Sequence, residues 1–129
     1  MPAKLDIEDI VDQIPGAAFQ LLLTQRGGVW LQWVSVGIRD LVGIDKKTAE
    51  RDVQALFALV LPSDLKPLQR AIQVVADEAR MINHDFRIRH AKTGEVRWLR
   101  SRARPVRNAD GTVVCNGIWL DITDLKQSA

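Results

Sequence analysis

Short turns that contain glycine are the feature that most constrains what this chain can fold into. Each turn separates two apolar stretches of strand length, and the turns lie at residues 25–28, 92–94 and 108–111. Glycine takes the positive φ that tight turns require, so each turn predicts a hairpin of antiparallel strands. We therefore expect a five-stranded antiparallel sheet, with strands at residues 17–24, 29–34, 82–90, 96–106 and 112–122.

Helical patterns fill the segment between the second and third expected strands. Apolar side chains recur there at three- and four-residue steps, which is typical of helices with one buried face. Short helical turns are expected at residues 36–42 and 48–60, and a longer helix at residues 64–79. A further amphipathic pattern over residues 5–14 predicts a cap helix in residues 1–15. The order of elements indicates an α+β fold in one domain, residues 16–125.

The only cysteine, Cys115, rules out a disulfide within the chain and a zinc site built on cysteines. No apolar run approaches the roughly 18 residues of a membrane-spanning helix, so no membrane contact is expected and the predicted location is cytoplasmic. The sequence also lacks a nucleophile with plausible His and Asp partners, a glycine-rich phosphate loop and a metal-ligand cluster. We therefore expect a module that is not an enzyme.

Basic residues are concentrated in residues 80–107. This segment contains nine Lys and Arg residues but only two acidic ones, Asp85 and Glu95. Such a cluster raises nucleic acid as a partner. Arginines that alternate with inward apolar residues are, however, the ordinary pattern of a strand with one solvated face, and aromatic residues for base stacking are scarce there. A nucleic-acid-binding module is therefore the less favoured alternative, and no nucleic-acid partner is expected.

Several short motifs, taken in order, resemble a PAS domain over residues 14–125. These are Trp33-Val34-Ser35, Leu41-Val42-Gly43, Leu61-Pro62-Ser63-Asp64-Leu65, Lys92-Thr93-Gly94, Asn108-Ala109-Asp110-Gly111 and Asp121-Ile122-Thr123. The chain is identified as a member of the PAS/PAC sensory-box family with a PAS_3-like fold. The resemblance implies helices inserted between the second and third strands.

The resemblance also implies a function. It predicts a sensory module from a bacterial multidomain signalling protein, a histidine kinase or a diguanylate cyclase, that relays a signal through rearrangement of a homodimer to a C-terminal effector. Residues 126–129 then either begin a signalling linker or are simply where the piece ends. A stand-alone module remains open.

Alignment with the flavin-binding branch of the family sets the strand phase, and with it a ligand cavity. The residues expected to face the cavity are Leu99, Ser101, Ala103, Cys115 and Trp119. Those expected to face outward are Phe86, Ile88, Trp98, Ile118 and Leu120. The same phase turns Asp85, Arg87 and Arg89 inward, where a charge must be paired. Three readings stay open: a structural Asp85–Arg87 pair, an arginine that recognises a carboxylate ligand, or an error of one residue in the strand phase.

Bound cofactors are not expected. Trp119 stands where the flavin-binding branch presents a glutamine, so its indole fills that space, and the helical segment lacks that branch's reactive cysteine. The expected helix at residues 64–79 has no histidine for haem, while His84 and His90 are expected to be exposed on a strand. A small ligand that is apolar or carries a carboxylate is the remaining possibility.

Two sets of residues are predicted to carry the signal. Asp121 and Thr123 resemble a hydrogen-bonded latch between the last strand and the output linker. The cap helix and the outer sheet face are expected to meet at or beside a two-fold interface, through Leu5, Ile7, Ile10, Val11, Ile118 and Leu120.

Overall fold

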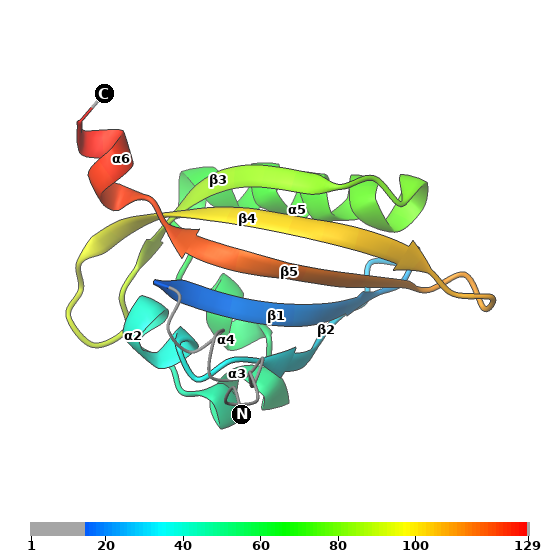
Figure 1. Cartoon of the computed structure of the whole chain (residues 1–129), viewed down its shortest axis with the longest axis horizontal. Helices are drawn as coiled ribbons and strands as arrows, with labels where there is room; N and C mark the ends of the chain where they lie inside the picture. The colour runs from blue at the N-terminus through cyan, green and yellow to red at the C-terminus, as the bar shows by residue number, and fades with distance from the viewer. Residues whose placement is uncertain (1–14, 129) are drawn as a thin grey trace, which may run out of the picture.

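The computed structural model describes residues 15–128 (Figure 1). Its elements are, in chain order, β1 (Gly16–Leu23), β2 (Val29–Val34), α2 (Ile38–Val42), α3 (Lys46–Arg51), α4 (Gln54–Phe57), α5 (Pro62–Glu78), β3 (Ile82–Arg89), β4 (Val96–Arg107), β5 (Val113–Asp121) and α6 (Thr123–Gln127). The cap helix expected in residues 1–15 falls almost entirely outside the described residues.

The five strands form one antiparallel sheet in the order β2-β1-β5-β4-β3. The first and last strands of the sequence, β1 and β5, are neighbours at the middle, where Phe19 lies opposite Gly117. This pairing closes the β1–β2 hairpin onto the β3–β4–β5 meander. The predicted α+β class, with helices inserted between the second and third strands, is confirmed.

Helices α3, α4 and α5 lie behind the sheet in Figure 1, so the sheet has an inner face toward them and an outer face toward the viewer. The core lies between the inner face and these helices. Its most completely buried large side chains are Leu23, Val34, Ile38 and Val113.

Helix α5 begins at Pro62, whose missing N–H costs nothing in the first turn of a helix. Leu68, Val75 and Ala76 are its buried residues, and they recur at the spacing of one helical face. Ala79 ends the helix in the left-handed region, with φ of 51°. Within residues 15–128, no helix is both long enough and apolar enough to cross a membrane.

The segment 48–60, expected to form short helical turns, contains the end of α3 and all of α4, with a break between them. The break is at Asp52, which is extended, with φ of −148°, and whose side chain accepts a hydrogen bond from the Gln54 N–H at 3.0 Å. An aspartate that bonds the backbone two residues ahead competes with the helix. The resulting α4 has four residues, none of them buried.

Both edges of the sheet carry side chains or backbone from neighbouring segments. On β2, the Val34 N–H donates to Glu50 at 3.0 Å, and the Val34 carbonyl accepts from the Lys46 ammonium at 2.8 Å. On β3, the Arg87 carbonyl accepts from the Leu61 N–H at 3.0 Å. Helix α3 therefore caps one edge and the segment before α5 caps the other.

Candidate functional site

An apolar cavity of about 60 Å³ lies between the inner face of the sheet and the helices. Its wall includes five of the seven residues predicted to bind a ligand: Leu99, Ser101, Ala103, Cys115 and Trp119. Helices α4 and α5 complete the wall with side chains such as Phe57 and Leu68. Its polar groups are a hydroxyl, a thiol and an indole, and no charged residue of the described chain lines it.

Trp119 occupies space on the side of the cavity next to β1. Its ring stacks on that of Phe19, with centroids 3.9 Å apart and planes 19° apart, a favourable aromatic geometry. The pair fills the region between the two central strands and limits the size of any molecule that enters.

Cys115 is buried in the same wall. Burial raises the pKa of its thiol to about 11, because the apolar surroundings disfavour the thiolate. The side chain is therefore a protonated, apolar part of the wall and not a nucleophile at neutral pH.

The predicted phase of β3 is wrong. Phe86 and Ile88 are buried and line the cavity, whereas Arg87 and Arg89 do not. The cause is the register: Phe86 lies directly opposite Leu99, and opposed residues of an antiparallel pair share a face. The two arginines are therefore removed from the cavity, and with them the predicted recognition of a carboxylate there.

Arg87 pairs instead with Asp64, in the first turn of α5. The guanidinium donates two hydrogen bonds to the carboxylate, at 2.7 and 2.9 Å, and the Arg87 backbone N–H donates a third at 2.8 Å. The hydrogen bonds from Arg87 hold the pKa of Asp64 at about 2. The predicted Asp85–Arg87 pair is not formed, and Arg87 joins β3 to α5.

Asp85 binds two cations of other elements. Arg100 on β4 donates to it at 2.8 and 3.1 Å, and the Lys126 ammonium on α6 lies 3.1 Å from it. The hydrogen bonds from Arg100 lower the pKa of Asp85 below its usual value. Arg89, the other predicted ligand contact, donates to the Gly94 carbonyl of the β3–β4 turn.

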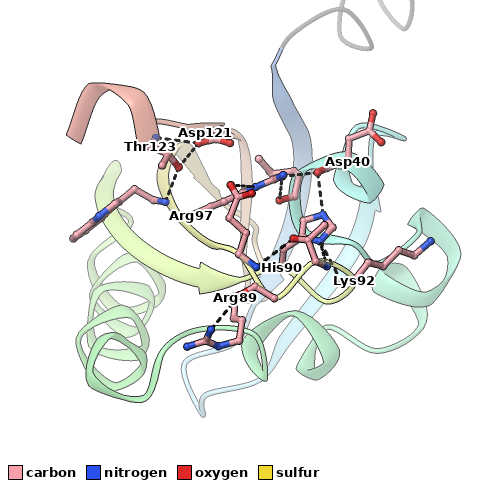
Figure 2. A network of polar contacts seen from close by, with 12 residues as sticks. Asp40, Arg89, His90, Lys92, Arg97, Asp121 and Thr123 are labelled. Carbon is pink, nitrogen blue, oxygen red and sulfur yellow. Dashed lines mark hydrogen bonds and ion pairs between the residues drawn. The ribbon is translucent and has the colours of Figure 1, made fainter. Parts of the chain in front are cut away.

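The end of β5 is tied to the start of β4 by Asp121 and Thr123 (Figure 2). The Thr123 hydroxyl accepts a hydrogen bond from the Trp98 N–H at 3.0 Å and donates one to Asp121 at 2.6 Å. Asp121 also accepts from the Thr123 N–H, and the Trp98 carbonyl accepts from the Ile122 N–H at 2.9 Å. Both backbone groups of Trp98 thus hold the start of α6, which we call the exit joint (residues 98 and 121–123).

The Trp98 ring lies on the outer face between two cations. The Arg87 guanidinium is 5.3 Å and the Lys126 ammonium 4.7 Å from the ring centroid, within reach of cation–π attraction. Helix α6 is therefore held by its side chains as well as by its backbone.

Ile118 and Leu120 lie on the outer face of the sheet, as predicted, and so does Trp98. All three side chains are half-buried. The other residues assigned to the interface, Leu5, Ile7, Ile10 and Val11, lie outside the described residues. The proposed contact between the two sets is therefore left as a prediction.

A second network, absent from the sequence prediction, joins the β3–β4 turn to α2 (Figure 2). Arg97 donates to the carbonyls of Asp40 and Leu41, at 2.7 and 3.0 Å, at the end of α2. His90, expected to be exposed, is buried, and its Nδ1 accepts from the N–H groups of Lys92 and Thr93. The ring proton is then on Nε2, which donates to the Asp40 carbonyl at 3.2 Å.

Gly43 is what admits the His90 ring. It ends α2 with φ of 85°, and a Cβ at this position would lie 2.7 Å from the ring. The glycine was read from the sequence as the end of a helix, but the pattern held no signal that a histidine from a distant turn packs on it.

Comparison with known proteins finds the same fold in a family profile and in solved structures. The profile of the family described as PAS fold matches residues 31–118, more than half of the chain. The methyl sulfide methyltransferase-associated sensor of Methanosarcina acetivorans is 29% identical over 132 residues. That match covers 99% of this chain but 13% of the sensor, so the chain spans a small part of the length of this relative.

Solved structures are similar over most of the chain. The N-terminal domain of a diguanylate cyclase with PAS/PAC sensor from Marinobacter aquaeolei has a TM-score of 0.69 at 18% identity, covering 84% of this chain and 98% of that one. A sensory box histidine kinase/response regulator from Burkholderia thailandensis has a TM-score of 0.63 at 19% identity, covering 86% and 81%. At these identities the structures show the fold, and together with the matching profile they show that the chain belongs to the PAS family.

Proposed function

We propose that this domain is the sensory input module of a bacterial multidomain signalling protein, and that it passes its signal to a C-terminal effector such as a histidine kinase or a diguanylate cyclase. Membership of the PAS family supports the sensory part. The similar structures from proteins with those outputs, and a relative named as a sensor, support the signalling context.

The observation that carries the proposal is the position of the exit joint beside the cavity. Leu99 lines the cavity, and its neighbour Trp98 binds the start of α6 through both backbone groups. A change in cavity packing that shifts β4 at Leu99 must therefore also act on the hydrogen bonds of Trp98. Figure 1 shows α6 projecting beyond the sheet, where it can lead into a following domain.

Hydrogen exchange tests this coupling. Ala103→Val adds volume inside the cavity, while Arg104→Val makes a change on the exposed outer face of the same strand. We expect the cavity variant to change amide exchange in α6 severalfold and the outer-face variant to leave it near the wild-type rate. Unchanged exchange in α6 for a folded Ala103→Val domain would contradict the relay.

We further propose that the relay works without flavin or haem. A cavity of about 60 Å³ is smaller than the roughly 150 Å³ apolar cavity that holds one benzene, and a tricyclic or tetrapyrrole ring is far larger than benzene. The purified domain is expected to be colourless. A visible absorption band at stoichiometric intensity would overturn this part of the proposal.

The relay is proposed to act within a homodimer that uses the outer sheet face. Ile118 and Leu120 place half-buried apolar surface there, on the side away from helices α3 to α5. Sedimentation of Ile118→Asp, compared with Asn116→Asp on the same face of the same strand, tests this. The first is expected to dissociate the dimer and the second to leave it intact; a wild type that stays monomeric at high concentration would refute the dimer.

A further inference from the structure

A second hollow adjoins the cavity at the end of the sheet opposite α6. It is a cleft of about 170 Å³, formed by the β1–β2 turn, α4 and the C-terminal half of α5. Figure 1 shows the β1–β2 turn at the end of the sheet opposite α6. Leu23, Phe57 and Ile72 line both the cleft and the cavity. The cavity and the cleft therefore share part of their walls.

The cleft has both apolar and polar residues in its lining, and its polar side chains are uncharged. They are contributed by Thr24 at the turn, Gln54 on α4, and Gln69 and Gln73 on α5. The amide nitrogen of Gln73 is already engaged, donating to the Gln25 carbonyl and to Asp77. Gln54 and Gln69 are exposed at the cleft, and within residues 15–128 their side-chain amides make no hydrogen bond to protein, so a ligand would exchange only water there.

One of the three shared side chains, Phe57, belongs to the shortest helix. It is the last residue of α4, which has only four residues, none of them buried. Segments with few buried contacts open at low free-energy cost. A small displacement of α4 would move the Phe57 ring and join the cleft to the cavity.

Together these features define a ligand class for the cavity. We infer that the domain binds an uncharged amphiphile, which enters through the cleft, places its apolar chain in the cavity past Phe57, and leaves a hydroxyl or amide head at Gln54 and Gln69. This inference rests on the proposed sensory function and deepens it. It also states where the ligand enters: at the end of the sheet opposite the exit joint.

The charge of the head group follows from the lining. No charged residue of the described chain lines either hollow. A carboxylate or an ammonium would therefore lose water without gaining an ion pair, which is costly. A hydroxyl or primary amide exchanges hydrogen bonds with water for bonds with the glutamine amides at little cost.

A homologous series of 1-alkanols is the probe, titrated into the isotopically labelled domain and followed by NMR. Each added methylene that enters the cavity is expected to tighten binding about fourfold, from the ordinary transfer free energy of a CH₂ group. The gain should stop once the cavity is full. Alkanoates of matched length are expected to bind at least tenfold more weakly. Signals are expected to shift at Gln69 in the cleft and at Leu68 and Ile88 in the cavity wall.

Variants separate the head contact from the general effect of replacing a surface glutamine of a helix. Gln54→Leu combined with Gln69→Leu is expected to weaken alkanol binding severalfold, while Gln127→Leu on α6 is the matched control and should bind as wild type does. Leucine is well tolerated in helices, so these variants are expected to fold.

Each outcome bears on the inference. Absence of saturable alkanol binding, alkanoates that bind as tightly, or full binding by the double glutamine variant would overturn it. The same spectra report on α6: alkanol binding that leaves the signals of Trp98 and Thr123 unmoved would support this ligand class and contradict the proposed relay.

Discussion

The two faces of the sheet are held by different forces. On the inner face, Phe86 and Leu99 pack into an apolar core that has no charged group in the described cavity wall. On the outer face, one residue away along the same strands, Arg87 and Trp98 take part in ion pairs, cation–π contacts and hydrogen bonds.

The difference assigns two tasks to neighbouring residues. Apolar burial is insensitive to direction and supplies most of the stability of a small domain. Hydrogen bonds and ion pairs are directional and contribute less net free energy each. The inner face therefore keeps the domain folded, and the outer face fixes the orientation of α6.

The largest expected effect comes from adjacent residues of β3. Phe86→Ala is predicted to lower the free energy of unfolding by about 3–5 kcal/mol, because it removes a buried aromatic side chain and leaves a cavity. Arg87→Ala is predicted to cause a much smaller loss, since its guanidinium is partly solvated. Urea denaturation measures both. Equal losses would abolish the distinction between the faces.

Acid is predicted to weaken the outer face before the inner one. The pKa of Asp64 is about 2 in the folded protein against an ordinary 3.8, so its pairing with Arg87 stabilises the fold fully above about pH 4. That contribution is lost as the pH falls from about 4 to 2, and it amounts to at most about 2 kcal/mol, reduced by solvent screening.

Asp64→Asn is the control for this titration. It is expected to be less stable than wild type at neutral pH and to approach wild-type stability near pH 2, as measured by urea denaturation at several pH values. If the variant and the wild type lose stability in parallel between pH 4 and 2, the Asp64–Arg87 pair does not contribute as described.

The smallest expected loss is at the exit joint. Thr123→Val and Asp121→Ala are each predicted to cost about 1 kcal/mol, the usual net contribution of a hydrogen bond. Their larger effect should be local, with faster amide exchange at Trp98 and in α6. Ser128→Ala, which removes a bond made only within the last turn of the chain, is the control. A large loss in the free energy of unfolding of Thr123→Val, with amide exchange in α6 at the wild-type rate, would contradict this prediction.

The sheet could be predicted because its signals are local. Alternation of apolar residues and glycine turns located all five strands. The strand phase was taken from the flavin-binding branch of the family, and it placed Leu99 and Cys115 correctly in the wall but was wrong for β3. The alternation of Phe86 and Ile88 with charged residues, read by itself, places the two apolar side chains inside.

The contacts of the site could not be predicted, because they join segments far apart in the sequence. Asp64, Arg87, Trp98 and Lys126 come from four different elements, and no periodic pattern connects them. His90 is a similar case, since its burial depends on a turn, a helix end and Gly43 meeting in space.

The capped edge of β2 decides how copies of this domain can associate. A strand from another molecule that paired with β2 at Val34 would have to displace both Glu50 and Lys46. A strand that paired with β3, at the opposite edge, would have to displace the hydrogen bond between Leu61 and Arg87. Strand swapping and fibril growth, which begin at open edges, are therefore obstructed on both sides of the sheet. Any contact between copies is therefore expected on the face of the sheet and not at its edges.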